Sequence, residues 1–352
     1  MHTLQSISGR FVLAGFLVFM LASHGGFAQS KVGTTAGQFL GIAVGPKAIS
    51  MGSAYVASND DASLLYWNPG GFVQAQQTQF VFSNTDWLVG TKFRWFGAMM
   101  NLDGQNAIGL SFTQLDYGEE EVTTVASPDG TGERWSASDL SIALSYSRLL
   151  SDRFSLGGSV KYISQSIWNE SASTFAFDLG LLFITSFNDM RLGVSMSNFG
   201  GDLKLDGRDL LSQVDIDPGN SGSNKDLVGS LKTDPWALPL LFRVGVAMDV
   251  YKDDDVRFTV AADALRPTDA EESINLGGEA GWRDMVFLRG GYKSLIGGGS
   301  EFTSRQDVQE GLTLGAGLKY RAEGIAQLEV NYAYSKFGLF GNLNTISIAV
   351  GL

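Results

Sequence analysis

The stretch Ser138–Ser147, SDLSIALSYS, decides the fold class because its apolar and small residues alternate. Leu140, Ile142, Leu144 and Tyr146 fall on one face of an extended strand, since strand side chains alternate with period two. The serines and the alanine between them fall on the other face. A strand that is apolar on one side and small or polar on the other is typical of the wall of a membrane β-barrel.

The same pattern recurs to the end of the chain. It predicts strands at residues 78–87, 93–101, 106–116, 137–149, 154–167, 173–185, 190–199, 240–250, 256–265, 273–282, 285–293, 311–321, 325–335 and 343–352. These are fourteen strands, an even number, as in bacterial single-chain barrels. We predict an all-β fold, a 14-stranded antiparallel transmembrane β-barrel over residues 78–352, with a soluble all-β repeat fold as the alternative.

The connections between these strands sort by length. The even-numbered ones are short, such as 150–153 and 252–255. Most of the odd-numbered ones are longer: Tyr117–Trp135, Trp168–Ser173, Gly200–Pro239, Arg266–Glu272, Ser294–Glu310 and Ser335–Asn342. Short periplasmic turns and long extracellular loops are typical of barrels in the bacterial outer membrane, which is the predicted location.

Charged residues follow the face of the strands that would line the lumen. They are Lys161, Asp178, Arg191, Arg243, Asp249, Arg257, Asp263, Glu279, Lys319 and Glu329. Five are basic and five are acidic, so they would neutralise one another in a polar lumen. On the lipid face, each would cost about 2–4 kcal/mol near the membrane midplane.

The first residues predict export. Arg10 precedes the apolar run FVLAGFLVFMLA, and Gly26-Phe27-Ala28 places small residues where a signal peptidase cuts. We predict a signal peptide over residues 1–28. The alternative, a single membrane anchor, would need about 20 apolar residues, more than this run contains.

The residue types limit the chemistry. Cleavage after Ala28 removes His2 and His24, the two histidines of a chain that has no cysteine. Histidine and cysteine are the usual general bases, nucleophiles and soft metal ligands. We therefore predict a non-enzymatic protein with no cofactor and no metal, leaving open a carboxylate-only enzyme or a calcium site. The formal charge of −12 disfavours nucleic acid as a partner.

The stretch Gly41–Val73, GIAVGPKAISMGSAYVASNDDASLLYWNPGGFV, lacks the alternation of the strands. A 14-stranded barrel is too wide for its own side chains to fill. The alternative, a disordered tail, conflicts with the many apolar residues of this region. We predict that residues 29–77 form a hatch inside or beneath the lumen.

The string from Thr35 to Phe72 resembles the N-terminal signature of the PorV/PorQ family within the FadL-type barrels. The predicted hatch motif comprises Met51, Gly52, Asp60, Asp61, Tyr66, Trp67, Asn68, Pro69 and Gly70, and Ala54, Val56, Ala57 and Ala62 also match the signature. Gly70 stands where most members have alanine. Pro239-Leu240, leading into Phe242-Arg243-Val244-Gly245, is similar to a second landmark of the family.

The resemblance implies a 14-stranded outer-membrane barrel with an N-terminal hatch, surrounded by lipid. Closer relatives serve the type IX secretion system, so one hypothesis gives the long loops a secretion-system protein or an exported cargo as partner. Other relatives carry hydrophobic small molecules, so the alternative is a FadL-like transporter with a hydrophobic ligand. The strand pattern does not distinguish the two hypotheses.

Overall fold

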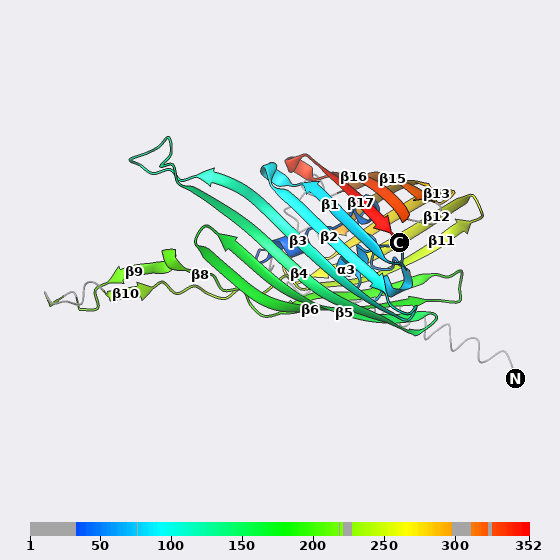
Figure 1. The fold of residues 1–352 in the computed structure, drawn as a ribbon, viewed down its shortest axis with the longest axis horizontal. Coiled ribbons are helices and arrows are strands. Elements are labelled where there is room, and N and C mark those ends of the chain that lie inside the picture. The colour runs from blue at the N-terminus through cyan, green and yellow to red at the C-terminus, as the bar shows by residue number, and fades with distance from the viewer. Residues whose placement is uncertain (1–32, 76, 218, 221–226, 298–310, 323–325) are drawn as a thin grey trace. The chain divides into compact units, whose positions relative to one another are not determined.

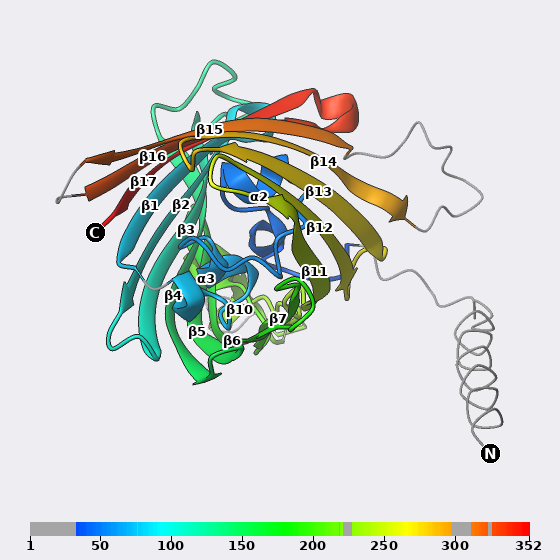
Figure 2. The ribbon, with the colours of Figure 1, turned by 90° about the vertical axis from the view of Figure 1, so that its right-hand side faces the viewer.

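The computed structural model describes residues 33–75, 77–217, 219–220, 227–297, 311–322 and 326–352. The predicted signal peptide, residues 1–28, lies outside the described residues. Fourteen strands form one closed antiparallel barrel (Figures 1 and 2), as predicted. They are β1 Gln79–Asp86, β2 Lys92–Asn101, β3 Asn106–Glu121, β4 Arg134–Ser151, β5 Phe154–Ile167, β6 Glu170–Ile184, β7 Arg191–Gly200, β11 Leu241–Lys252, β12 Val256–Pro267, β13 Ser273–Trp282, β14 Val286–Gly297, β15 Leu312–Ala322, β16 Ala326–Lys336 and β17 Asn342–Gly351.

The first and last strands close the barrel. β1 pairs with β17 from Gln79 opposite Gly351 to Asp86 opposite Asn344. Because the number of strands is even, both chain ends of the barrel lie on the same side, where Leu352 N donates a hydrogen bond to Thr78 O at 2.8 Å. Closure leaves no strand of the wall with an open edge.

The two faces of the wall differ as the sequence predicts. On β4, Leu144 is 65% exposed on the outside, whereas Ser145 beside it is 2% exposed on the inside. Large apolar residues such as Phe175 and Leu288 cover the outer face elsewhere. The outer face is therefore suited to lipid, and the inner face carries small and polar groups.

The connections sort by end as well. We call the end with connections such as 122–133 and 201–240 the long-loop end, and the opposite end the short-turn end. One predicted loop is wrong: β6 begins at Glu170, so Trp168–Ser173 contains only a tight turn at residues 168–169. The pairing of β5 with β6 continues through Ser166 opposite Ser171, beyond the apolar part of the wall, so these residues are strand and not loop.

The longest connection contains structure of its own. β8, Asp206–Gly207, pairs with the start of β6, and the 3-10 helix η4, Arg208–Leu210, follows it. β9, Leu211–Val214, and β10, Leu227–Ser230, then form a separate hairpin. Figure 1 shows this hairpin projecting well beyond the ends of the barrel strands. Two further 3-10 turns lie in short connections: η3 Leu88–Gly90 and η7 Gly338–Phe340.

The segment before β1 lies within the ring of strands, where Figure 2 shows α2 and α3. It contains η1 Gln38–Gly41, α2 Pro46–Ser50, α3 Leu64–Trp67 and η2 Phe72–Ala75. Its apolar side chains, including Phe39, Leu64 and Phe72, are buried and form most of the core. We call residues 33–75 the N-terminal segment. No helix among the described residues has the length and hydropathy needed to cross a membrane.

Candidate functional site

The two sequence landmarks meet inside the barrel. The guanidinium of Arg243, on β11, lies 5.4 Å from the ring centre of Tyr66 and 5.2 Å from that of Trp67. Trp67 Nε1 donates a hydrogen bond to Val44 O at 2.9 Å, which fixes the indole within the N-terminal segment. Such cation–π contacts strengthen when the cation is withdrawn from water, and Arg243 is only 4% exposed.

The N-terminal segment touches the wall at three places where two glycines on neighbouring strands lie directly opposite each other and a polar residue lies beside them on a third strand. At the first, Ser147, Gly157 and Gly180 pair across β4, β5 and β6 beneath Pro69 and Gly70. A Cβ at Gly157 would lie 2.6 Å from the carbonyl carbon of Pro69, and one at Gly180 would lie 2.8 Å from its Cδ. Ser147 Oγ donates a hydrogen bond to Gly70 O at 3.2 Å. We call this the neutral contact.

Asn68 completes the neutral contact. Its Nδ2 donates hydrogen bonds to Val56 O at 2.7 Å and to Leu181 O, on β6, at 2.9 Å. Its Oδ1 accepts one from Gly70 N at 3.0 Å. The side chain is fully buried, so these three bonds satisfy groups that water cannot reach.

At the second place, Gly193, Gly245 and Asp263 pair across β7, β11 and β12. Asp263 Oδ2 accepts hydrogen bonds from Tyr55 N at 2.7 Å and from Val56 N at 2.9 Å. A Cβ at Gly245 would lie 2.5 Å from Val56 Cγ1, so the glycine gives the segment its room. We call this the carboxylate contact.

At the third place, Gly277, Gly291 and Thr313 pair across β13, β14 and β15. Thr313 Oγ1 accepts a hydrogen bond from Gly52 N at 3.0 Å and donates one to Ser50 O at 3.0 Å. Gly52 has φ +65°, a left-handed conformation that glycine adopts without steric cost. We call this the hydroxyl contact.

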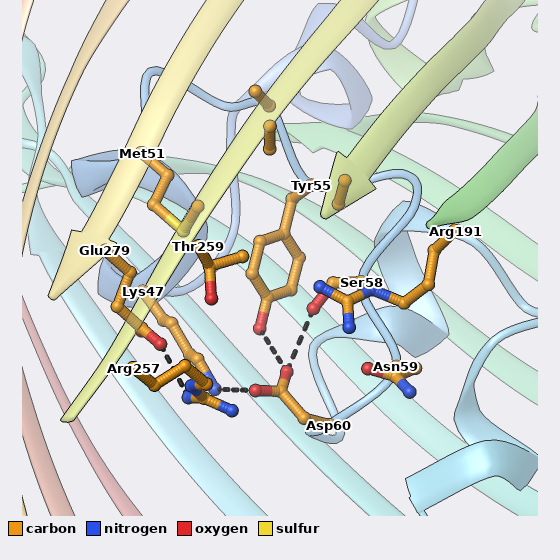
Figure 3. Close-up of a pocket in the computed structure, with 13 residues that line it drawn as sticks. Lys47, Met51, Tyr55, Ser58, Asn59, Asp60, Arg191, Arg257, Thr259 and Glu279 are labelled. Carbon is orange, nitrogen blue, oxygen red and sulfur yellow. Dashed lines mark hydrogen bonds and ion pairs between the residues drawn. The ribbon is translucent and has the colours of Figure 1, made fainter. Parts of the chain in front are cut away.

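The segment also has a charged group of its own, drawn in Figure 3. Lys47 Nζ forms an ion pair with Asp60 Oδ2 at 2.5 Å. The Tyr55 hydroxyl lies 2.9 Å from Asp60 Oδ1 and 3.1 Å from Asp61 Oδ2. Ser63 donates to Asp61 Oδ1 from both its backbone N–H and its hydroxyl.

Burial and the neighbouring charges shift the pKa values of Lys47, Asp60 and Asp61. Burial raises the pKa of Asp60, but the charge and hydrogen bond of Lys47 outweigh burial and hold that pKa well below its usual range. Burial lowers the pKa of Lys47, and the nearby carboxylates, Asp60 first, raise it above its usual range. For Asp61, burial dominates and raises the pKa. Lys47 and Asp60 are therefore a charged pair, and Asp61 is the weaker acid.

Six of the ten predicted lumen charges form pairs with one another. Lys161 Nζ lies 2.7 Å from Asp178 Oδ2, Arg191 Nη2 lies 3.3 Å from Asp249 Oδ1, and Arg257 Nη2 lies 2.7 Å from Glu279 Oε1. Arg243 and Asp263 instead face the N-terminal segment.

The last two predicted lumen charges have other partners. Lys319 Nζ lies 2.8 Å from Asp284 Oδ2. Glu329 Oε1 lies 4.0 Å from Arg289 Nη2, and Arg289 Nε also lies 2.6 Å from Glu279 Oε2. The sequence prediction missed Arg289 and Lys47. Arg289 follows the apolar Leu288 within a strand, and the period-two pattern that places Leu288 on the outer face places Arg289 on the inner one, a signal that could have found it.

Two cavities border the N-terminal segment. The short-turn cavity, of about 30 Å³, is the one in Figure 3 and is lined by Lys47, Met51, Ala54, Tyr55, Ser58, Asn59, Asp60, Arg191, Ala247, Arg257, Thr259, Ala261 and Glu279. The long-loop cavity, of about 20 Å³, is lined by Gly41, Ala43, Ser53, Tyr66, Trp67, Arg243, Asp263, Leu265, Asn275 and Lys293. Both are of the size that holds about one water molecule.

A closed 14-stranded barrel with an apolar outer face, a polar inner face and long loops at one end defines an outer-membrane β-barrel. Residues 26–220, more than half of the chain, match the model of the type IX secretion system protein PorV family, and the chain belongs to this family. It is a protein of the bacterial outer membrane.

Solved structures share the fold at low sequence identity. The CymD monoaromatic hydrocarbon channel has a TM-score of 0.55 at 13% identity, covering 88% of this chain and 96% of that one. The Pseudomonas putida toluene transporter TodX has a TM-score of 0.52 at 12% identity, covering 86% and 96%. The Ralstonia pickettii toluene transporter TbuX has a TM-score of 0.51 at 11% identity, covering 88% and 97%. No curated protein sequence matches the chain.

Proposed function

We propose that this barrel serves protein secretion by binding an exported protein or another secretion component with its extracellular loops, and that it is not an enzyme. The observation that carries the proposal is the β9–β10 hairpin, which stands outside the barrel with large apolar side chains exposed, such as Leu211 at 53% and Val228 at 68%. A two-stranded hairpin alone is marginally stable in water. Exposed apolar patches of this kind mark sites of protein–protein contact.

The proposal gives residues 29–77 the role of a hatch, preceded by the signal peptide 1–28. The three contacts with the wall support the role of a hatch. They hold the N-terminal segment on β4, β5 and β6, on β7, β11 and β12, and on β13, β14 and β15, which are different sides of the lumen. Eight of the nine members of the predicted hatch motif are buried, namely Met51, Gly52, Asp61 and Tyr66 to Gly70, and the ninth, Asp60, pairs with Lys47. The hatch would keep the lumen closed while the loops engage a partner.

The alternative function is transport of a hydrophobic small molecule. The fold shared with the toluene transporters TodX and TbuX supports it. The cavities beside the N-terminal segment argue against transport, because they measure only about 30 and 20 Å³. Pockets for small apolar ligands usually measure about 300 Å³ or more and are mostly apolar.

Co-purification tests the proposal. The barrel, tagged and solubilised from outer membranes in mild detergent, should bring down a secretion component or an exported protein. The double variant Leu211→Ser, Val228→Ser should recover about tenfold less of it, since each truncated apolar anchor costs about 1 kcal/mol or more.

The control is Gln213→Ala with Ser230→Ala, which changes two polar residues on the same face of the hairpin. This variant should recover the partner as the wild type does. Recovery of the wild-type barrel alone, together with saturable binding of an aromatic hydrocarbon, would instead favour transport.

A further inference from the structure

We infer that the strip Ser53–Val56 is the gate of a narrow polar path through the hatch, open to water and small ions when the strip moves. The inference rests on the proposed hatch role. It starts from the two cavities, because they lie on opposite sides of this strip: Ala54 and Tyr55 line the short-turn cavity, and Ser53 lines the long-loop cavity.

The cavities are stacked along the same three strands. β11 contributes Ala247 to the short-turn cavity and Arg243 to the long-loop cavity. β12 does the same with Thr259 and Asp263, and β13 with Glu279 and Asn275. The two residues of each pair are four positions apart, or about 13 Å along a strand, and on β12 Ala261 of the short-turn cavity lies two positions before Asp263. The two cavities are therefore successive compartments beside one sector of the wall.

The strip that lies between them is held by the carboxylate contact. Asp263 Oδ2 accepts the N–H groups of Tyr55 and Val56, and Val56 packs on Gly193 and Gly245. Ser53 has φ +64°, next to the left-handed Gly52. Serine seldom adopts the left-handed conformation, because it costs free energy for a residue with a side chain. Residues 52–53 are therefore a place where the backbone can change conformation.

The linings decide what the path suits. Lys47, Asp60, Arg191, Arg257 and Glu279 line one cavity, and Arg243 and Asp263 line the other. Two buried atoms at these cavities, Asp263 Oδ1 and Arg191 Nε, have no hydrogen-bond partner within the described part of the chain. Buried polar atoms are normally satisfied, and each cavity has room for about one water molecule, so the path suits water and small ions.

Ion conductance of the purified full-length barrel in planar bilayers tests the gate. The wild type should conduct little in potassium chloride. Asp263→Ala removes the acceptor of the strip and should raise the conductance severalfold, whereas Asp263→Asn keeps an acceptor oxygen and should stay close to the wild type. Val56→Gly thins the strip without changing the wall and should also raise the conductance, which provides a second variant if Asp263→Ala does not fold.

Ser147→Ala is the matched control, because it removes the hydrogen bond to Gly70 O at the neutral contact without touching the strip Ser53–Val56 or either cavity. Its conductance should rise less than that of Val56→Gly. The gate assignment is overturned if the folded Asp263→Ala and Val56→Gly variants conduct no more than the wild type, or no more than Ser147→Ala. A wild type that already conducts strongly would instead contradict the hatch itself.

Discussion

The neutral contact and the carboxylate contact hold one segment to one wall by opposite means. At the neutral contact, the backbone of Pro69-Gly70 lies directly on Gly157 and Gly180, and every hydrogen bond is made by uncharged groups. At the carboxylate contact, the oxygen of one acid, Asp263, receives two N–H groups of the segment. The first depends on shape and tolerates no added atom, and the second depends on one ionisable group. The difference suggests that the segment is fixed at β4–β6 and released at β11–β12.

Gly180→Leu should have the largest effect on stability. The new side chain would displace Pro69 and Gly70, since even a Cβ would lie 2.9 Å from Gly70 N. Overpacking of this kind costs about 3 kcal/mol or more, so the free energy of unfolding in detergent should fall by that amount. Urea denaturation followed by tryptophan fluorescence measures it. Gly290→Ala, on the outward face of β14, is the control and should be nearly neutral, because a Cβ there has only ordinary contacts.

Asn68→Ala should have the next largest effect. It leaves Val56 O and Gly70 N buried without their side-chain partner, at a cost of about 2–3 kcal/mol. Asp263→Asn, which retains an acceptor for the other contact, should cost about 1 kcal/mol. Urea midpoints of the two variants compare the contacts directly. Equal losses would remove the distinction between a fixed and a releasable contact.

Asp60→Asn should have the smallest effect at neutral pH, about 1 kcal/mol, because the Asp60 side chain is 35% exposed. The variant is informative because it should change how the free energy of unfolding depends on pH. The pKa of Asp60 is lowered in the folded protein, so its contribution is present above the usual carboxyl pKa of about 4 and is lost as the pH falls below it. The raised pKa of Lys47 keeps that group charged up to and beyond about pH 10.

Urea midpoints between pH 3 and pH 8 check the sign. The wild type should lose stability below about pH 4, and Asp60→Asn should lose less. Asp61→Asn should respond in the opposite way, since the pKa of Asp61 is raised and its protonation favours the folded state. Parallel curves for all three proteins would show that this charged group does not link the hatch to pH.

The sequence predicts the wall well because the strand signal is local. Alternation along SDLSIALSYS predicts a strand and the face that is apolar, without any knowledge of the partner strand. The fourteen strands and their closure follow from repetition of that signal. At the long-loop end the predicted strands 106–116 and 137–149 are too short: β3 continues to Glu121 and β4 begins at Arg134, because outside the membrane a strand needs no apolar residues to continue.

The three contacts with the N-terminal segment could not be predicted in the same way. Gly157 and Gly180 are visible in the sequence, but their position opposite each other depends on the register of two strands. Arg289 meets Glu279 for the same reason. Lys47 lies in a segment without a repeating pattern, so nothing local indicates its pairing with Asp60.

The three contacts also impose an order in time. Gly52 is synthesised 261 residues before Thr313, its partner on β15, and Tyr55 is synthesised 208 residues before Asp263. The N-terminal segment therefore completes its carboxylate and hydroxyl contacts only when the last third of the chain has been made, whereas the strands of the neutral contact, β4–β6, are made earlier. Contacts so distant in sequence form slowly. Seating of the segment and closure of β1 on β17 must then occur late and close together, so the exposed apolar residues near the start of the chain need a chaperone until that step.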